Sequence, residues 1–386
     1  MSAAYIVEAV RTAGGKRKGM LAGTHPADMG AAVLDALVAR SGVDPAAIED
    51  VLMGCVTQGG EQAFAFGRNC VLASGLPDSV PSVTVDRQCG SSQQSLQFAA
   101  QAVMSGTQDL VIAAGAESMT RVPMFSNMSV YEKAGIGTGP FAPSIQQRYG
   151  VPAFSQFAGA QMIADKYGFT REDMDRFALE SHRKAAAAIE AGAFRDEIVG
   201  IDTEHGMFDQ DEGVRFDASL EKMGSMDPLA EGGTITAANA SQMTDGASGV
   251  LVASEAALKT HGLTPLARIH HFSVSAGDPV VMLEEPIPGT RKALAKAGMS
   301  LDDIALFEVN EAFASIPMAW LKALDADPAK LNVNGGAIAL GHPLGASGTK
   351  LMTTLVHALR KRGGKYGLQT MCEGGGMANV TIVEAL

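Results

Sequence analysis

Cysteine is scarce in this chain and does not occur in the spacings that build metal knuckles or disulfide frameworks. The 386 residues contain four cysteines, Cys55, Cys70, Cys89 and Cys372, and no CxxC pair. Closely paired cysteines are what a zinc knuckle or a small disulfide-linked domain requires. We therefore expect reduced cysteines, a reducing compartment and no metal site.

A positive surplus, a long apolar run and an export signal are also missing. The net charge of -12 argues against a nucleic-acid partner and gives no attraction to an anionic membrane. No run of about 18 apolar residues occurs, so no membrane span is expected. The basic residues near the start follow the apolar strand, the reverse of a secretory signal, and the final VEAL is not a retention or peroxisomal address. We expect a cytoplasmic protein with neither a nucleic acid nor a membrane as partner.

The composition that remains is that of a large globular protein. Hydrophobic residues make up 46% of the chain and charged residues 19%, so wholesale disorder is excluded. The 44 glycines predict many tight turns and close backbone approaches. The length is sufficient for two or three domains with a substantial core.

One α/β unit occurs twice. The segments ending at Gly42 and Gly298 each give an amphipathic helix, a glycine stop and an acidic turn, followed by strands over Val51–Val56 and Ala305–Val309. In a second pair of segments, Cys89 and Gly345 open two helices. Both pairs are 256 positions apart. A repeated offset predicts a duplicated domain, although any doubly wound protein alternates strands and helices in this way.

An irregular segment, rich in glycine and proline and then helical, interrupts the first unit. We therefore expect an α/β protein with two duplicated domains, mixed and mostly parallel sheets, and an inserted loop domain. An insertion near helix-opening turns is a natural platform for a ligand. The expected boundaries are 1–117 and 243–264 for the first domain, 118–242 for the loop domain and 265–386 for the second domain.

Four clusters of chemically active residues follow predicted strands, where ligands collect in parallel sheets. A helix N-terminus favours the thiolate of Cys89, and the imidazole of His342 is able to take its proton. Asn310 is able to orient a water molecule, and Cys372 is a second thiol suited to acid/base work if its pKa is tuned toward neutrality. The glycines around His342 and after Cys372 let backbone N–H groups approach a substrate oxygen.

Each of these residues also has a simpler interpretation. A buried cysteine is often a small core residue, and Cys55 and Cys70 are expected to be core. His342 alone fits a loop histidine. The glycine-rich loop around it fits a phosphate cradle, although it has no P-loop lysine and does not match G-x-G-x-x-G.

The four clusters resemble the signature blocks of the thiolases, the acetyl-CoA acetyltransferase family. The matching segments are CGSS at 89–92, NEAFA at 310–314, GGAIALGHPLGASG at 335–348 and CEGGGMANV at 372–380. The opening YIVEAVRT and the block TITAANASQMTDGA are also similar, so the resemblance covers nearly the whole chain. It implies the thiolase fold, a homodimer or homotetramer, and coenzyme A as cosubstrate with no permanently bound cofactor.

The resemblance also implies a role for each residue. Cys89 is the nucleophile that becomes acylated. His342 deprotonates it and, with a water held by Asn310, stabilises a thioester oxyanion. Cys372 protonates the acetyl-CoA carbanion in thiolysis, and the N–H groups of Cys89 and Gly374 form a second oxyanion hole. The coenzyme A contacts implied in this way are Ser241, Ala237, Phe313 and Arg215.

The reaction expected from this resemblance is CoA-dependent cleavage of a 3-ketoacyl-CoA, with ping-pong kinetics. Three departures from the short-chain members argue against a plain acetoacetyl-CoA enzyme: Ser155 and Gln156 in place of His-Met, the block DRQCGSSQQ, and Glu373 in place of an apolar residue. They point to a degradative enzyme for a longer, branched or ring-derived acyl group. The alternatives are a decarboxylating ketoacyl synthase, a non-catalytic acyl-CoA-binding relative and a cysteine hydrolase.

Overall fold

The structure, a computed structural model, describes residues 3–386, and strands from both ends of the chain meet in one mixed sheet. From edge to edge, this sheet runs in the order β11 (Leu306–Val309), β12 (Tyr366–Glu373), β13 (Met377–Ala385), β10 (Ala267–Ala276), β1 (Ala4–Thr12), β9 (Thr244–Ser254), β5 (Leu110–Ser118), β3 (Asp50–Gly54) and β4 (Ser82–Val85). The short strands are β2 (Gly15–Lys16) beside β9, β6 (Ile198–Val199) beside β1, and the separate hairpin of β7 (Ile201–Thr203) and β8 (Gly206–Phe208).

Strand directions confirm the expected mixed and mostly parallel α/β class. Strands β3, β4 and β5 are parallel neighbours, as are β11 and β12. Within residues 3–386, β9 and β13 are the strands that run against the rest of their own half. The two halves join through β1 and β10, where only Tyr5–Arg268 and Ile6–Ala267 are paired. Two separate sheets were expected; this short antiparallel contact makes them one.

The duplication is visible in the element bounds. Helix α3 spans Ser91–Ser105 and helix α13 spans Ser347–Lys361, so both ends of the two helices are 256 positions apart. The starts of β3 and β11, and of β5 and β12, differ by the same offset of 256. Cys89 and Gly345 therefore occupy equivalent places, two residues before their helices rather than at the first helical residue.

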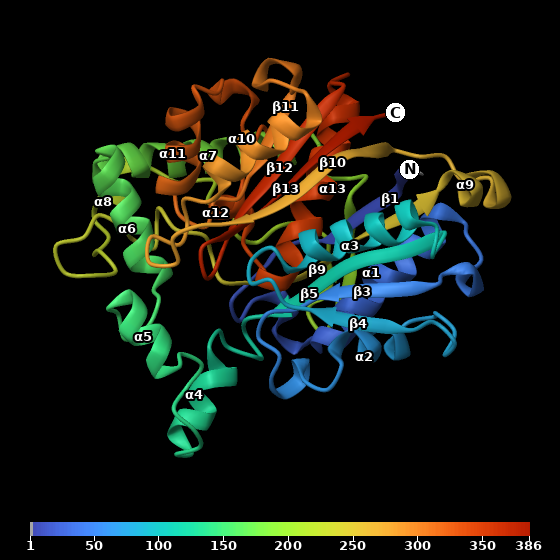
Figure 1. Cartoon of the computed structure of the whole chain (residues 1–386), viewed down its shortest axis with the longest axis horizontal. Coiled ribbons are helices and arrows are strands. Elements are labelled where there is room, and N and C mark those ends of the chain that lie inside the picture. Colours follow the sequence, from blue (N-terminus) through green and yellow to red (C-terminus); the bar gives the residue numbers. More distant parts are fainter. Residues whose placement is uncertain (1–2) are drawn as a thin grey trace.

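The helices cover both faces of the sheet (Figure 1). The remaining helices are α1 (Pro26–Ser41), α2 (Phe66–Ala73), α4 (Ser126–Lys133), α5 (Pro143–Tyr149), α6 (Gln156–Tyr167), α7 (Arg171–Glu190), α8 (Leu220–Gly224), α9 (Glu255–His261), α10 (Pro286–Ala297), α11 (Ser315–Leu324) and α12 (Ala337–Leu340). In the part of the chain that the structure describes, no helix is both long and apolar enough to cross a membrane.

Alternation along the strands divides the core into layers. On β5, Val111 and Ala113 face a core shared with α3 and α13, whereas Ile112 and Ala114 face the outer helices α1 and α2. The outer face of the second half packs against α6, α7, α10 and α11. Successive residues of a strand point to opposite faces of the sheet. A strand that helices cover on both faces, such as β5, therefore buries the side chains on both of its faces. The expected core cysteines, Cys55 and Cys70, lie fully buried in the outer layer of the first half.

The two central helices are polar although they are buried. Gln93 and Gln97 of α3 are almost completely buried and donate to Thr381 Oγ1 at 2.9 Å and to the Val380 carbonyl at 3.1 Å. Buried amides of this kind are favourable only when they are hydrogen-bonded. These bonds tie α3 to β13 of the other half, so they fix the turn that precedes α3.

The segment between β5 and β9 carries α4 to α8. Figure 1 shows α4 and α5 extending away from the sheet, whereas α6, α7 and α8 lie beside the second half. Helix α6 packs on α11 and α7 on α12. The insertion therefore covers the carboxyl ends of the parallel strands.

Candidate active site

Cys89 lies between β4 and α3, in a turn pressed closely onto the sheet. A side chain at Gly115 of β5 would place its Cβ 2.2 Å from the Gly345 carbonyl, and one at Gly54 of β3 would lie 2.5 Å from Ser92 N. Only glycine permits such close backbone approach. Both helix-opening turns, at residues 89 and 345, therefore sit directly on the strand ends.

The structure brings the other predicted site residues to the same end of the sheet, where the parallel strands have their carboxyl ends. Asn310 follows β11, Cys372 and Gly374 lie at the end of β12, and His342 lies between α12 and the turn at 344–346. Because β11 and β12 are parallel, their carboxyl ends adjoin. Asn310 Nδ2 is 3.4 Å from His342 Nε2, and the two thiols are close enough for a Cys89 charge to raise the pKa of Cys372.

His342 is held in one orientation by Ser347. The Ser347 hydroxyl lies 2.5 Å from His342 Nδ1 and 2.8 Å from the Pro343 carbonyl. If the hydroxyl donates to that carbonyl, its oxygen accepts the proton of Nδ1, which leaves Nε2 as the basic nitrogen on the Asn310 side. The tautomer of a buried imidazole is set by the partner of its other nitrogen.

Replacing Ser347 by alanine is expected to slow acylation of Cys89 about tenfold to a hundredfold, part of the ~10²–10⁴ that a positioned base contributes. The reason is the loss of the tautomer that presents Nε2. Single-turnover acylation followed by intact-protein mass measures it, with Ser95→Ala as the matched control because Ser95 is another buried serine on a central helix. Ser347→Thr, which keeps the hydroxyl, should restore the rate; acylation of Ser347→Ala at the wild-type rate would contradict the assignment.

Burial keeps both Cys89 and His342 uncharged. It raises the pKa of the Cys89 thiol to about 12, with Glu373 as the second contributor. Burial and the nearby Lys350 charge lower the pKa of His342 to about 3. The sequence-based expectation that the helix N-terminus favours a thiolate is therefore wrong for the free protein, since burial outweighs it. The thiol must lose its proton as it attacks.

Cys372 is likewise held as a thiol. Burial first, then the charges of Cys89 and Glu373, raise the pKa of Cys372 well above its usual range. Tuning toward neutrality, which was the condition set for acid/base work, is not observed. A thiol that stays protonated is nevertheless suited to donating a proton to a strongly basic carbanion.

Two backbone N–H groups and one amide oxygen at this edge have no protein partner. Within residues 3–386, the N–H groups of Cys89 and Gly374 donate to no other residue. In the same range, the buried Asn310 Oδ1 accepts no hydrogen bond. Buried polar groups are almost always paired. Groups without a partner beside two thiols fit places for substrate oxygens or a bound water.

A cavity of about 690 Å³ opens beside these residues and is lined by Ser241, Ala237, Phe313 and Arg215 together with His342. Main-chain pairing between 239–241 and 312–314 brings Ser241 and Phe313 together: Ser241 N donates to the Ala312 carbonyl at 2.9 Å, and Ala240 bridges to Phe313. Met119 and Leu344 line the cavity and pack in the cluster that contains Cys89. The four predicted coenzyme A contacts therefore share one cavity that leads to the nucleophile.

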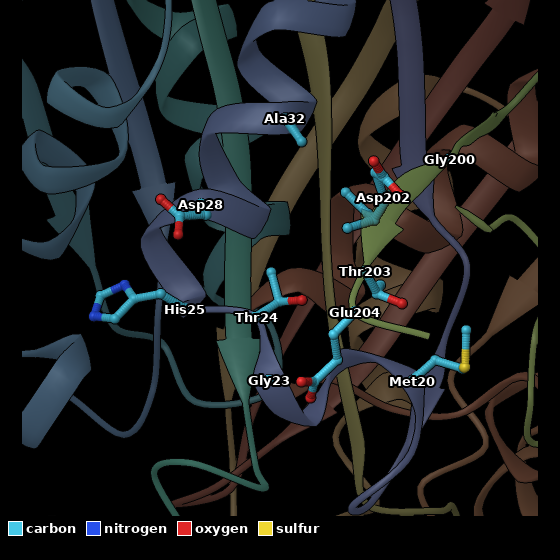
Figure 2. A pocket seen from close by; sticks show the side chains of 11 residues that line it. Met20, Gly23, Thr24, His25, Asp28, Ala32, Gly200, Asp202, Thr203 and Glu204 are labelled. Carbon is cyan, nitrogen blue, oxygen red and sulfur yellow. The ribbon is translucent and has the colours of Figure 1, made fainter. Parts of the chain in front are cut away.

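A second hollow, of about 550 Å³, lies elsewhere on the surface. Figure 2 shows His25 and Asp28 of the first helix region on one side and Asp202, Thr203 and Glu204 on the other. None of the predicted site residues lines it, and its lining contains no cysteine. The chemistry is therefore assigned to the first cavity.

Several residues of this site were missed in the sequence. His182 of α7 lines the cavity, and burial lowers its pKa to about 4. Glu117 at the end of β5 accepts hydrogen bonds from the backbones of Val56 and Gly345. Ser347 lies five residues after His342 in the same glycine-rich block, and that proximity was the one available signal for it. His182 and Glu117 gave no signal, because their roles depend on elements distant in sequence.

Comparison with known proteins settles the family. The profile of the thiolase N-terminal domain matches residues 4–256, and that of the thiolase C-terminal domain matches residues 263–385. The chain belongs to the thiolase family. The resemblance inferred from the four sequence blocks is thereby confirmed, and so is the fold class.

This thiolase is similar over its whole length to several bacterial relatives. It is 57% identical to the steroid 3-ketoacyl-CoA thiolase FadA6 of Mycobacterium tuberculosis, an alignment that covers 100% of this chain and 95% of the relative. It is 40% identical to the 3-ketoacyl-CoA thiolase of Bacillus subtilis, and 40% identical to the acetyl-CoA acetyltransferase of Escherichia coli, with both chains of each pair covered completely. The family assignment therefore applies to the inserted segment as well.

Proposed function

We propose that this thiolase is an acyltransferase that cleaves 3-ketoacyl-CoA with free coenzyme A, giving acetyl-CoA and an acyl-CoA shortened by two carbons. The observation that carries the proposal is the convergence of Cys89, Cys372, Asn310 and His342. Asn310 Nδ2 is 3.4 Å from His342 Nε2, His342 lines the cavity, and the two thiols are close enough for a charge on Cys89 to raise the pKa of Cys372. The relatives named 3-ketoacyl-CoA thiolase support it. Mixing enzyme, a 3-ketoacyl-CoA and coenzyme A must yield acetyl-CoA and the shortened acyl-CoA in equal amounts.

In the first half of the reaction, Cys89 Sγ attacks C3 of the substrate while its proton passes to His342 Nε2. The bond between C2 and C3 then breaks, and Cys89 keeps the acyl group. The electron pair left on C2 takes the proton of the Cys372 thiol, so acetyl-CoA departs and Cys372 becomes a thiolate. The high pKa of Cys372 suits this donor role, because it supplies a proton where a carbanion develops.

In the second half, the thiol of coenzyme A attacks the acyl group on Cys89. Its proton passes to the Cys372 thiolate, and His342 returns the first proton to Cys89 as that sulfur leaves. Charge on one carbonyl oxygen is stabilised by His342 and a water held by Asn310, and charge on the other by the N–H groups of Cys89 and Gly374. Each such donor is worth roughly 3–4 kcal/mol of barrier.

Coenzyme A binds in the cavity. Ser241 and Ala237 contact the cosubstrate, Phe313 packs beside the pantetheine arm, and the exposed Arg215 pairs with its phosphates. The edge-to-face contact of Phe313 with Phe157, with ring centroids 5.6 Å apart, fixes the Phe313 ring. No metal takes part in this mechanism.

The acyl group is bulky, either long, branched or ring-derived. Gln156, one of the departures from short-chain members, lines the cavity, and Ser155 beside it caps α6 by accepting from Ala158 N at 3.3 Å. Five methionines also line it, Met119, Met124, Met223, Met226 and Met243. Methionine is flexible and fits irregular apolar shapes. The name of the 57% identical relative, a steroid 3-ketoacyl-CoA thiolase, favours a ring-derived group.

We predict a kcat/KM at least about tenfold higher for ring-derived 3-ketoacyl-CoAs than for acetoacetyl-CoA, since roughly 1–3 kcal/mol is gained from each well-buried methylene group. A thiolysis panel of acetoacetyl-CoA, a linear long-chain and a ring-bearing 3-ketoacyl-CoA at one coenzyme A concentration measures it. Equal values across the panel would remove the support for a bulky substrate while leaving thiolysis itself intact.

The organisation of the chain is part of the proposal. The first domain comprises 1–117 and 243–264, the loop domain 118–242 and the second domain 265–386. All four cysteines are free, and the mechanism needs both reactive ones reduced, which favours the cytoplasm. We expect a homodimer or homotetramer. Exposed apolar side chains near edge strand β4, Phe64 and Val83, support an interface with a second copy.

A further inference from the structure

The internal duplication pairs two buried carboxyl groups. Glu117, near the end of β5, and Glu373, at the end of β12, are 256 positions apart and both fully buried. Each reaches the helix-opening turn of the other half. Glu117 accepts from Gly345 N at 3.0 Å, before α13, and the Glu373 carboxyl lies against Gly90, before α3. The fold therefore places one carboxyl group at each of its two equivalent turns.

The two carboxyl groups differ in how they are satisfied. Glu117 accepts four hydrogen bonds, from the backbones of Val56, Thr57 and Gly345 and from the Gln62 amide, at 2.8 to 3.0 Å. Glu373 has the Asn379 amide, which donates to its Oε1 at 2.6 Å when its nitrogen faces the carboxyl. Glu117 therefore holds the surrounding backbone in place, whereas Glu373, beside the nucleophile, has fewer hydrogen-bond donors.

Glu373 fills the space over the turn that carries Cys89. A Cβ at Gly90 would lie 1.9 Å from Glu373 Oε1, so the carboxyl rests on the Gly90 backbone. The reverse contact also exists: a Cβ at Gly374 would lie 2.9 Å from Gln88 Oε1. The residues on either side of Cys89 thus interlock with Glu373 and Gly374, each side chain lying over the glycine of the facing segment.

We propose that Glu373 and Gln88 are positioning residues, which set the separation between the Cys89 and Gly374 N–H groups that receive a substrate oxyanion. The proposal rests on the proposed thiolase reaction. Neither side chain needs to touch the substrate, since both act through the backbone of the facing segment. A shift of about 1 Å in such an arrangement typically costs 10²-fold in rate.

Glu373 performs this role as a neutral acid. Burial raises its pKa to about 8, with Arg87 opposing the rise. The groups that face it are Arg87 and Cys89 from the turn before α3, Cys372 from its own strand, and the uncharged Asn379 from β13. At neutral pH it is therefore mostly protonated. Above pH 8 it ionises, and its charge then opposes both thiolates and the oxyanion, so activity falls as the pH rises through 8.

Four variants test the proposal: Glu373→Ala, Glu373→Gln, Gln88→Ala and, as control, Thr290→Val, which removes a buried hydrogen bond from Trp320 in the outer layer of the second half. Glu373→Ala and Gln88→Ala should lower kcat for C–C cleavage by about 10- to 100-fold with unchanged KM for coenzyme A. Glu373→Gln, which has the shape of the neutral acid, should retain most of kcat at pH 7 and lose the decline above pH 8. Thr290→Val should lower only the unfolding temperature.

Hydrogen exchange at the Cys89 and Gly374 amides gives a readout that does not require turnover. Exchange at least about tenfold faster in Glu373→Ala and Gln88→Ala than in wild type supports the proposal. Unchanged exchange overturns it, as does an equal fall of kcat in Thr290→Val or a rise of KM at constant kcat. If the wild-type enzyme cleaves no 3-ketoacyl-CoA, the proposed function fails, and the exchange result still decides whether the two side chains hold the turn.

Discussion

Cys89→Ala is expected to lower thiolysis by at least about 10⁴-fold, as is typical when a covalent nucleophile is removed. Without Sγ no acyl group is stored, and no other thiol replaces it, because Cys372 lies on a different element and acts as the acid. The measurement has two parts: steady-state release of acetyl-CoA, and intact-protein mass after mixing with a 3-ketoacyl-CoA. The acyl adduct seen in wild type should be absent from the variant.

The matched control is Cys70→Ala. Cys70 is a fully buried cysteine in the outer core of the first half, away from the cavity. It should lose stability, by roughly 1–2 kcal/mol for a small cavity, and keep its acyl adduct. An acyl adduct on Cys89→Ala, or undiminished turnover, would show that the nucleophile is a different group.

Cys372→Ala is expected to separate the two halves of the reaction. C–C cleavage should fall about 10³-fold, because the carbanion on C2 loses its proton donor. Acylation of Cys89 by a saturated acyl-CoA involves no carbanion, so it should proceed within a few-fold of the wild-type rate. The rates of thiolysis and of acyl adduct formation are measured on one enzyme preparation, and the ratio of the two rates tests the prediction.

Two results would count against the two-thiol mechanism. If Cys372→Ala cleaved 3-ketoacyl-CoA at the full rate, the proton would come from elsewhere. If it lost acylation and cleavage equally, Cys372 would be required to hold Cys89 in place. Cys372→Ser distinguishes these cases further, because it keeps the size of the side chain while raising its pKa. It should resemble the alanine variant in cleavage.

The duplicated α/β unit was predictable because its 256-residue offset can be found from short-range sequence patterns. The glycine stops, the helix-opening residues and the apolar runs each have a short-range signature, and together they located Cys89, Asn310, His342 and Cys372 at strand ends. Parallel strands then place those ends at one edge without any knowledge of long-range contacts. The family resemblance added the roles, which remain predictions for each residue.

The protonation states were not predictable from sequence. A local view places Cys89 before a helix, which favours the thiolate. Burial under Leu344 and Met371, which are more than 200 positions away in the chain, instead raises the pKa of its thiol, and Glu373 adds to the rise. The union of the two sheets also depends on a long-range contact, the pairing of Tyr5 with Arg268. Short-range patterns contain no information on either.

The suppressed ionisation of Cys89 affects how readily its sulfur is oxidised while no substrate is bound. Peroxides and other oxidants attack thiolates, and a sulfur oxidised beyond the sulfenic acid is lost for good. A group with a pKa of about 12 presents almost no thiolate while the enzyme waits for substrate. The sulfur becomes reactive only when a carbonyl carbon is in place to accept it. Burial thus protects the resting enzyme from oxidation, and the cost is a nucleophile that must be activated anew in every turnover.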